Sequence, residues 1–544
     1  MKKIIILIIV FCNHTFLVAG QTWQWALSDG STNVEQTISL CTDVLGNVYT
    51  SGYFGEGPAP VNFGVFAGDT LYLQGATDIF IASYDQNGNG NWAKRAGTNT
   101  VGFNYLFETG YLCSNIADSS IFLYGFYAGN FSLDTFFFPG DPNKKEFFIS
   151  KFNYGGNCLW VKRATSLQST GTLKSMSSDQ TGKSYLTGIV DSAGVLDSIN
   201  IPAGGFVSRI NADGKFLWAK RVYDIWESGS WQIKATPSGF IASGVFIDTA
   251  YIDTIPVISK GSHDIFVASF DSLGSVQWVK TFGGNSSDYG SKLSLDANNN
   301  IYISASFVDT LYLDSVLFTN SNRDLVLIKL DPVGNLIWAR QLIATGDAQI
   351  NDIDADQDGN VYITGRFSQS ITFGSNTLST MNNLDMFLAR YNSSGNCLGV
   401  RQLANVEGTN VVSDQGGVIV SGLFSGSMTL GSTTLTSNGI TDMFIARHDA
   451  FTGVGEIGLE RNSGLFIYAN PTTGKCTINI PDEFINDLNL TLRVYNSLGK
   501  LIKEYPISQN EGKIFLNLDS EAKGTYIAKI DNGTKQYTGR IVFE

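Results

Sequence analysis

Histidine, cysteine and charged residues are all scarce in this chain. Among 544 residues there are 3 His and 6 Cys, and only 16% of the residues are charged. His14 falls in an apolar N-terminal segment, so His263 and His448 are left for any acid–base or metal chemistry. The sequence also lacks a phosphate-cradling loop, a nucleophile elbow and a Cys-x-x-Cys pair. These absences argue against most zinc hydrolases and against catalysis by a Ser-His-Asp triad.

The cysteines do not form a disulfide framework. Beyond Cys12 they number five, an odd count, and they are scattered singly along the chain. We therefore expect mostly buried thiols, with at most one or two bridges. These five are Cys41, Cys113, Cys158, Cys397 and Cys476.

Long apolar runs are lacking as well. A short apolar core at 4–10 follows Lys2 and Lys3, and small residues follow it at 18–20. This pattern predicts a signal peptide over residues 1–20, cleaved after Gly20. Because the run is too short to span a bilayer, we expect an exported protein with no transmembrane segment.

What the chain does contain is glycine, aromatic residues and negative charge. The 58 Gly and 12% aromatic residues, without a collagen period, indicate a folded chain with a large core. Acidic residues outnumber basic ones by 49 to 36, a net charge of −13. Since such a surface repels phosphate groups, nucleic acid and anionic lipid are poor partners.

An internal repeat of about 60 residues is the strongest signal. In each copy an alternating apolar strand leads through Asp/Asn-x-x-Gly into a second strand. Asp or Asn accepts hydrogen bonds from the turn backbone, and Gly supplies the positive φ that closes the hairpin. The copies are DIFIASYDQNGNGNWAKR (78–95), EFFISKFNYGGNCLWVKR (146–163), GFVSRINADGKFLWAKR (205–221), DIFVASFDSLGSVQWVK (264–280), DLVLIKLDPVGNLIWAR (324–340), DMFLARYNSSGNCLGVR (385–401) and a shortened DMFIARHDA (442–450).

A second sequence pattern, of the kind DQDGNVYITGRF (356–367), precedes each copy of the first, and a weaker strand pair lies between the two patterns. Each unit therefore offers about four short strands. Seven such units predict an all-β fold with a seven-bladed β-propeller over 21–455. The seventh unit lacks its Trp strand, while an orphan copy stands at 23–26, so we expect an N-terminal strand to close the ring.

These two sequence patterns resemble the secreted bacterial β-propeller repeats, also called SBBP-type repeats. The resemblance covers about 22–450 and is specific for fold. For function it implies little, because such repeats are generally scaffolds without a shared catalytic motif.

The repeat ends after Gly453, and 456–463 reads as a linker. Seven short apolar strands in 464–544 then predict a small immunoglobulin-like β-sandwich. Its motifs are Asn470-Pro471-Thr472-Thr473-Gly474, Val494-Tyr495-Asn496-Ser497-Leu498-Gly499-Lys500, Gly524-Thr525-Tyr526 and Gly539-Arg540-Ile541-Val542.

This module resembles the type A C-terminal sorting domain of type IX (Por) secretion cargo in Bacteroidetes. The resemblance implies recognition of residues 464–544 by the outer-membrane translocon, with later release or attachment at the cell surface. The resemblance also implies that Pro471, Gly474, Gly499, Gly524 and Tyr526 have both structural and signal roles. A generic binding sandwich is the alternative.

Asp354, Asp356, Asp358 and Gly359 match the start of a calcium loop, in which alternate carboxylates converge on one hard cation. The bidentate Glu expected at position 364 is a Thr, and Asp356 and Gly359 align with an ordinary turn at Asp43 and Gly46. The sequence therefore favours a structural turn, with calcium as the alternative and no other cofactor expected.

Other candidate residues also read as structural. His448 occupies a strand position held by Tyr or Phe in other units, and the periodic Trp residues fit packing between blades better than sugar stacking. The Lys-Arg pairs at 94–95, 162–163 and 220–221 fit solvated outer strands rather than a polyanion-binding stripe. Polar residues that break the repeat are Glu108, Asp224 and Glu227, in segments that also read as elongated loops.

The first functional hypothesis is a non-enzymatic binding or adhesion scaffold, secreted or held at the outer-membrane surface, with a glycan or protein ligand. One alternative is a secreted hydrolase or lyase with its site in the axial funnel, because propellers also carry enzymes. Another is a structural envelope component.

Overall fold

The computed structural model describes residues 23–56, 63–98, 109–141, 145–163, 171–190, 192–201, 203–223, 232–314, 316–380, 384–414, 417–449, 465, 467–468, 472–480, 484, 490–496, 499–507, 512–532 and 536–543. Within this part the chain is almost entirely β-strand, with one short 3₁₀ turn at Ile116–Asp118. The predicted signal peptide at 1–20 and the linker at 456–463 lie outside the described residues.

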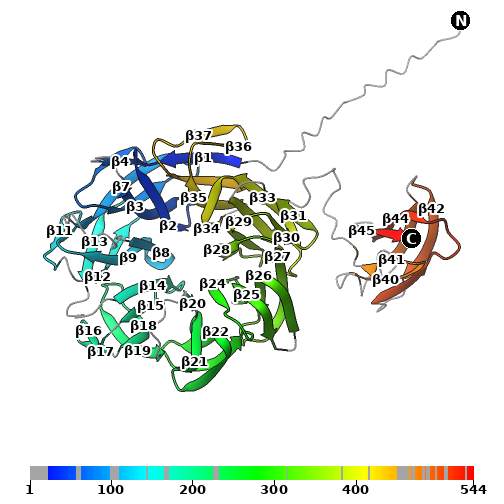
Figure 1. Cartoon of the computed structure of the whole chain (residues 1–544), viewed down its shortest axis with the longest axis horizontal. Coiled ribbons are helices and arrows are strands. Elements are labelled where there is room, and N and C mark those ends of the chain that lie inside the picture. Colours follow the sequence, from blue (N-terminus) through cyan, green and yellow to red (C-terminus); the bar gives the residue numbers. More distant parts are fainter. Residues whose placement is uncertain are drawn as a thin grey trace, which may run out of the picture. The chain divides into compact units, whose positions relative to one another are not determined.

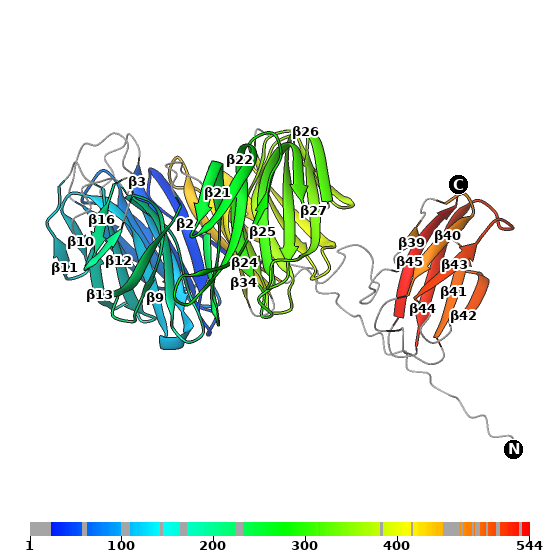
Figure 2. The same cartoon turned by 90° about the horizontal axis from the view of Figure 1, so that it is seen from below.

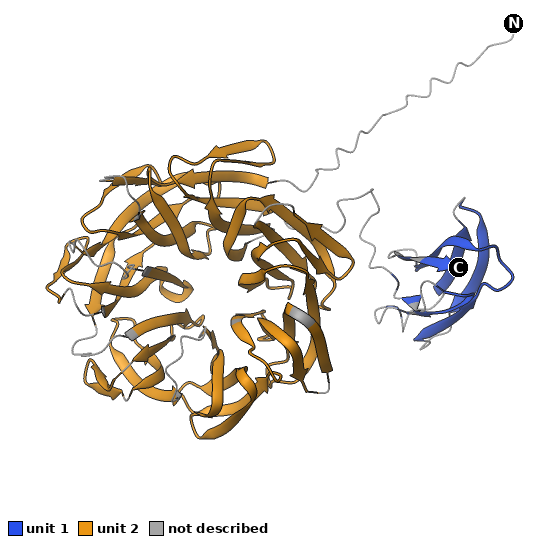
Figure 3. Ribbon diagram, in the orientation of Figure 1, with its two compact units in different colours: residues 1–18, 456–544 blue, residues 19–455 orange. Residues whose placement is uncertain are grey.

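The chain divides into two compact units, which Figure 3 shows in different colours. The larger lies within residues 19–455 and contains β1 to β38, and the smaller includes residues 456–544 and contains β39 to β45. Each unit has its own buried core.

The larger unit is built from seven sheets that follow one another around a central axis (Figure 1). Their strands run from one face of this unit to the other (Figure 2). With strands given from the innermost outward, the first sheet has β2 (Val34–Thr42), β3 (Val48–Glu56), β6 (Asp78–Tyr84) and β7 (Gly90–Thr98), and the second has β8 (Thr109–Asn115), β9 (Ser120–Ala128), β12 (Lys145–Asn153) and β13 (Cys158–Arg163). The third sheet has β14 (Gly171–Ser178), β15 (Ser184–Val190), β18 (Gly204–Ile210) and β19 (Phe216–Tyr223), the fourth has β20 (Gln232–Thr236), β21 (Gly239–Ile252), β22 (Ile255–Asp271) and β23 (Val276–Phe282), and the fifth has β24 (Tyr289–Leu295), β25 (Ile301–Leu313), β26 (Val316–Leu330) and β27 (Leu336–Ala344). The sixth sheet has β28 (Ala348–Ala355), β29 (Val361–Phe367), β32 (Asp385–Tyr391) and β33 (Cys397–Ala404), and the seventh has β34 (Val406–Asp414), β35 (Gly417–Phe424), β38 (Asp442–Asp449) and β1 (Trp23–Asp29).

The seventh sheet takes its outermost strand from the beginning of the chain. β1 pairs antiparallel with β38, with Ala26 opposite Ala446. This pairing confirms the expectation that the strand at 23–26 completes the seventh unit. Isolated bridges of Gly30 with Val65 and of Val34 with Thr441 also join the seventh sheet region to the first.

Short hairpins form the weaker strand pair of each unit. Two of them extend the outer strand of the preceding sheet, because β10 pairs with β7 and β30 pairs with β27. In the fourth and fifth sheets the hairpin is continuous with the long strand pairs β21–β22 and β25–β26. The separate hairpins are β4 (Phe63–Phe66) with β5 (Asp69–Tyr72), β10 (Phe131–Leu133) with β11 (Phe136–Phe138), β16 (Gly194–Leu196) with β17 (Ile199–Ile201), β30 (Ser370–Phe373) with β31 (Asn376–Ser379), and β36 (Ser427–Leu430) with β37 (Thr433–Thr436).

The hydrophobic core of this unit lies between the sheets. Each of seven buried clusters draws its side chains from two consecutive sheets, and one of them joins the seventh sheet to the first. In that cluster Met443 and Ile445 pack with Phe54 and Phe80. Since burial of apolar area is the main stabilising term, each sheet depends on both of its neighbours.

A tryptophan on the outer strand of one sheet packs on the turn glycine of the next sheet. A Cβ placed on Gly214 would lie 2.5 Å from the Trp160 ring, and Gly214 has a φ of +76°. The indole Nε1 of Trp160 donates to the Ala212 carbonyl in the same turn at 3.2 Å. Only Gly combines the required φ with room for the indole. The six pairs are Trp25–Gly88, Trp92–Gly156, Trp160–Gly214, Trp218–Gly274, Trp278–Gly334 and Trp338–Gly395.

The missing tryptophan at position 399 now has a physical reason. An indole there would pack on a turn between the third and outermost strands of the seventh sheet. β38 has no such hairpin, because its outer partner β1 comes from the other end of the chain. Gly399 therefore stands where no indole is required.

Side chains also join the innermost strands. These strands are sheet edges, whose unpaired backbone N–H groups need partners. Ser39 Oγ accepts from Leu112 N at 3.0 Å, and Ser294 Oγ accepts from Ala355 N at 3.1 Å. Each bond crosses from one sheet to the next.

The smaller unit has two sheets around one core. One sheet has the order β39 (Ile467–Tyr468), β40 (Lys475–Asn479), β43 (Lys513–Asn517), and the other β42 (Leu501–Ile507), β41 (Leu490–Asn496), β44 (Gly524–Asp531), β45 (Gln536–Phe543). Ile478 and Leu516 of the first sheet share a buried cluster with Leu492 and Ile530 of the second.

The tryptophan contact of β1 is testable. We expect Trp25→Ala to lower the free energy of unfolding by about 2–4 kcal/mol, somewhat less than the loss of a fully buried aromatic ring, because the Trp25 side chain is only partly buried. Trp160→Ala should have a similar effect, because its indole makes the same contact between the second and third sheets. Calorimetric melting of both variants measures this.

Phe137→Ala serves as the control, because the Phe137 side chain is 61% exposed and its loss should change little. If Trp25→Ala melts like the wild type while Trp160→Ala is destabilised, the contact of β1 with the first sheet does not stabilise the larger unit.

Candidate functional site

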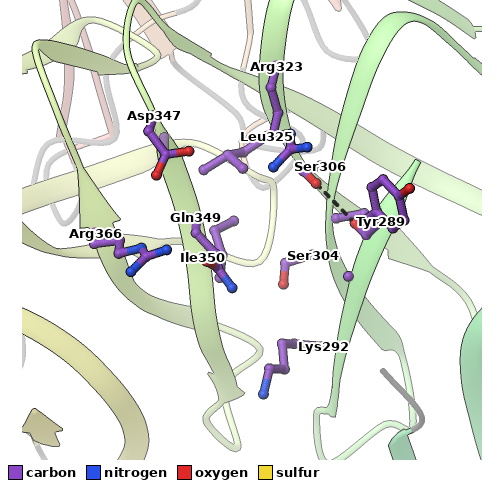
Figure 4. A pocket seen from close by; sticks show the side chains of 13 residues that line it. Tyr289, Lys292, Ser304, Ser306, Arg323, Leu325, Asp347, Gln349, Ile350 and Arg366 are labelled. Atoms are coloured by element: carbon purple, nitrogen blue, oxygen red, sulfur yellow. Dashed lines mark hydrogen bonds between the residues drawn. The ribbon is translucent and has the colours of Figure 1, made fainter. Parts of the chain in front are cut away.

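A pocket lies between the fifth and sixth sheets (Figure 4). It has a volume of about 190 Å³ and is lined by β24, β25 and β26 on one side and by β28 and β29 on the other. Leu325 and Ala348 are buried in its wall. Because pockets for drug-sized ligands typically have about 300–1,000 Å³, this one has room for a single small group.

The charged residues of the described lining are mostly basic. Lys292, Arg323 and Arg366 line the pocket together with a single carboxylate, Asp347. This balance is opposite to that of the whole chain, whose net charge is −13. The remaining polar lining residues are Tyr289, Ser304, Ser306 and Gln349.

The basic groups come from three different strands. The Arg323 guanidinium lies 5.9 Å from the Tyr289 ring centre, and Arg366 Nη1 lies 3.4 Å from Glu407 Oε1. Within the described residues, Arg366 Nε is buried without a hydrogen-bond partner. Such a donor is costly unless something accepts from it.

Arg366 lies on β29 opposite Met386, on the face of the sixth sheet that packs against the seventh, where it meets Glu407 of β34. The residues at the same register in the other sheets are uncharged: Tyr53, Phe126, Ile189, Val245, Ser306 and Leu423. No motif in the sequence indicated this cation, although its departure from the repeat is visible in GRF at 365–367.

The pocket rim contacts one of the two histidines. His263 Nδ1 lies 3.3 Å from the Tyr289 hydroxyl and 2.9 Å from Ser262 Oγ, and the two rings are 4.9 Å apart. His448 is elsewhere and is buried. Its Nδ1 donates to the Asp449 carbonyl, and burial lowers its pKa. His448 thus has the strand-packing role that its position indicated.

The candidate calcium residues make separate contacts. Asp354 Oδ2 accepts from Ser413 N at 2.8 Å and from Ser413 Oγ, and Asp354 Oδ1 accepts from Ser294 Oγ. Asp356 Oδ1 accepts from the turn nitrogens of Asp358 and Asn360. Across the described ranges, no three His, Cys, Asp or Glu side chains are grouped so that they could hold a metal.

Two pairs of buried carboxylates occur where one sheet leads to the next. Burial, with a smaller contribution from the Asp442 carboxylate, raises the pKa of Glu35 to about 7. Burial likewise raises the pKa of Asp288 to about 7, with Asp264 adding to the effect. All four side chains are almost fully buried, so they are not in position to act on a substrate.

The other sequence candidates have structural settings or lie outside the described part. Gly474 has a φ of +128°, and a Cβ there would lie 1.9 Å from Asp519 Oδ1. Gly499 and Gly524 also have positive φ, and the buried Tyr526 donates its hydroxyl to the Ala522 carbonyl. The candidates outside the described residues are Glu108, Asp224, Glu227 and Pro471. All five described cysteines are free thiols.

Family models match two parts of the chain. Residues 466–544 match a secretion system C-terminal sorting domain, and residues 337–366 match a β-propeller repeat. The chain thus contains a secretion system C-terminal sorting domain and a β-propeller repeat. The sorting domain marks the chain for type IX secretion, to the cell surface or the extracellular space. None of the helices in the described part could span a membrane.

Individual relatives add little. An uncharacterized WD repeat-containing protein of Acanthamoeba polyphaga mimivirus is 24% identical over 271 residues, which are 42% of this chain and 19% of that relative. The chain therefore spans less than a fifth of that relative's length.

Two solved structures are similar at low scores. The extracellular domain of a putative one-component system from B. thetaiotaomicron is 11% identical, with a TM-score of 0.26 over 94% of this chain and 74% of that one. A glycoside hydrolase family 32 structure from Bifidobacterium adolescentis is 9% identical, with a TM-score of 0.26 over 78% of this chain and 82% of that one. Scores this low support no inference about ligand or activity.

The contacts of Asp354 predict a structural role. We expect Asp354→Ala to lower the free energy of unfolding by about 1–3 kcal/mol, because the partly buried Ser413 donors and the buried Ser294 hydroxyl lose their acceptor. Asp358→Ala is the control, since Asp358 is exposed. Thermal melting with and without millimolar calcium measures both effects. A calcium-dependent stabilisation that Asp354→Ala abolishes would favour a metal site instead.

The buried carboxylates predict a pH dependence. Glu35 and Asp288 have pKa values of about 7 when folded, against ordinary values of 4.5 and 3.8, so the folded state holds more protons between these limits. The free energy of unfolding that these two carboxyl groups contribute should therefore be greatest below about pH 4 and should be lost as the pH rises to about 7. We expect the double variant Glu35→Gln/Asp288→Asn to melt with a smaller loss between pH 5 and pH 8.

Asp358→Asn, which changes an exposed carboxylate, should keep the wild-type slope. An identical slope in the double variant would contradict the assignment to these two groups.

Proposed function

We propose that this β-propeller repeat protein is a non-enzymatic binding scaffold that presents the pocket between its fifth and sixth sheets to a ligand outside the cell. The observation that carries the proposal is the pocket itself, where basic side chains depart from the repeat in an otherwise acidic chain. The buried carboxylate pairs lie within the core, which favours binding over hydrolysis.

The proposed architecture is a closed seven-bladed propeller over 21–455, preceded by a signal peptide and followed by a linker and an immunoglobulin-like sorting domain at 464–544. Seven inter-sheet clusters, including one between the seventh and first sheets, support the closed ring. Two sheets around one core support the sandwich. Export uses the sorting domain, and the translocon is the expected partner.

The binding proposal is tested with the purified full chain on an array of glycans and surface proteins, beside a general screen for glycoside hydrolase and lyase activity. Binding without turnover is the expected result. Turnover of an array glycan would favour the hydrolase or lyase alternative. Absence of both binding and turnover would favour a structural envelope component.

The export route gives a separate prediction. Deleting 464–544 should leave the protein inside the outer membrane, because the sorting signal is lost. The measurement is protease accessibility of an epitope in the propeller on intact cells of a type IX-competent host. Surface display of the truncated chain would contradict the assignment. The Phe515→Ala variant, which changes a side chain that is 78% exposed, is a control that should be displayed normally.

A further inference from the structure

The outer face of the four-stranded sheet in the smaller unit has a row of apolar side chains. Leu501 of β42 and Ile527 of β44 both lie opposite Tyr495 of β41, so the three residues follow one another across three neighbouring strands. Leu501 is 43% exposed, Ile527 is 38% exposed, and Tyr495 between them is half-buried. Figure 2 shows the three strands side by side. We call these three residues the apolar row.

The alternation of side chains along each strand fixes the direction in which the row faces. Val494 and Ala528 belong to the buried cluster that the two sheets of this unit share. Since successive side chains of a strand point to opposite faces of the sheet, their neighbours Tyr495 and Ile527 point outward. The apolar row therefore faces away from the core.

Ion pairs border the apolar row. Arg493, two residues before Tyr495 on β41, bonds to Glu504 at 2.8 Å and to Asp531 at 3.3 Å. Lys529 of β44 also pairs with Asp531, at 3.4 Å. These positive and negative charges balance one another. An apolar centre with a polar border is the arrangement typical of a protein–protein interface.

We infer that the apolar row is the surface by which the sorting domain contacts the outer-membrane translocon. The inference rests on the proposed export function and names the contact surface.

The occupant follows from the module to which the row belongs. Residues 466–544 match a secretion system C-terminal sorting domain, so a component of the secretion system has to recognise this module. Neighbouring apolar side chains that are exposed together mark such interaction sites in soluble proteins. A membrane surface suits the row less well, because the balanced ion pairs beside it are not the clustered Lys and Arg that bind anionic lipid.

The outer face of the three-stranded sheet provides a comparison within the same unit. Phe515 of β43 is 78% exposed there, but it lies opposite Thr477, and Lys513 and Asn517 are its outward-facing neighbours along the strand. One aromatic side chain among polar neighbours offers less continuous apolar surface than three side chains in a row. Phe515 is therefore the matched control, an exposed apolar residue outside the apolar row.

The test is surface display of the full chain in a type IX-competent host, measured by protease accessibility of an epitope in the propeller on intact cells. Leu501→Ser/Ile527→Ser should reduce display at least about tenfold, because loss of central apolar contacts weakens an interface by this much or more. Leu501→Met/Ile527→Val keeps both side chains apolar and should be displayed like the wild type. Phe515→Ser should also be displayed normally.

Photo-crosslinking identifies what the row contacts. A benzophenone amino acid that replaces Ile527 in the full chain should crosslink to an epitope-tagged subunit of the translocon. The same amino acid in place of Phe515 should not form this crosslink. Crosslinks from position 527 to lipid alone would overturn the inference.

Folding of the double serine variant is checked by melting of the purified full chain. Its curve should match that of the wild type, because Leu501 and Ile527 are exposed. If the variant melts earlier, the crosslink from position 527 decides, since that chain is otherwise wild type.

Failure of this inference is distinguishable from failure of the export function. Normal display of Leu501→Ser/Ile527→Ser, beside retention of the chain that lacks 464–544, would overturn the inference and leave the sorting assignment intact. Display of the chain that lacks 464–544 would overturn both.

Discussion

The contact between an outer-strand indole and the turn glycine of the next sheet is the interaction on which the larger unit depends. A four-stranded sheet with two apolar faces cannot bury both of them alone, so each sheet needs a neighbour on either side. The indole fixes how two sheets meet, because it both fills the space over the glycine and donates to the turn, as Trp338 does to Ser393 at 2.9 Å. The Asp-x-x-Gly turn thus serves two purposes: it closes a hairpin and receives the neighbouring ring.

The inner edges pose a second constraint, which accounts for the acidic residues near the axis. Innermost strands have no partner on their axial side, and their N–H groups must bond to side chains or water. Asp352 and Asp354 alternate along β28 and accept from Val411 N at 3.0 Å and Ser413 N at 2.8 Å. A run of alternate aspartates in a strand therefore resembles a calcium loop in sequence while its carboxylates serve backbone donors.

The repeat made the fold predictable in this chain, because turn chemistry and strand alternation are local. The register of Trp92, the hairpin at Asp85 and Gly88, and the displaced strand at Trp25 all agree with the structure. The pocket was not predicted, because its lining comes from β24, β26 and β29, and only the packing of two sheets brings Lys292, Arg323 and Arg366 to one place. The buried Glu35 and Asp442 were likewise invisible, since they are 407 residues apart in sequence and meet where the seventh sheet faces the first.

A repeat fold also changes how functional residues are recognised. Where every position is sampled seven times by one chain, the other copies show what packing alone requires. At the position that corresponds to Arg366, the other six sheets have Tyr, Phe, Ile, Val, Ser and Leu, so packing there requires little more than a side chain of moderate size. Arg366 departs from this set, and its Nη1 lies 3.4 Å from Glu407 Oε1 of the neighbouring β34, so an ion pair between two sheets accompanies the change. The same comparison assigns the tryptophans, which make the same contact in six of the seven sheets, to the scaffold.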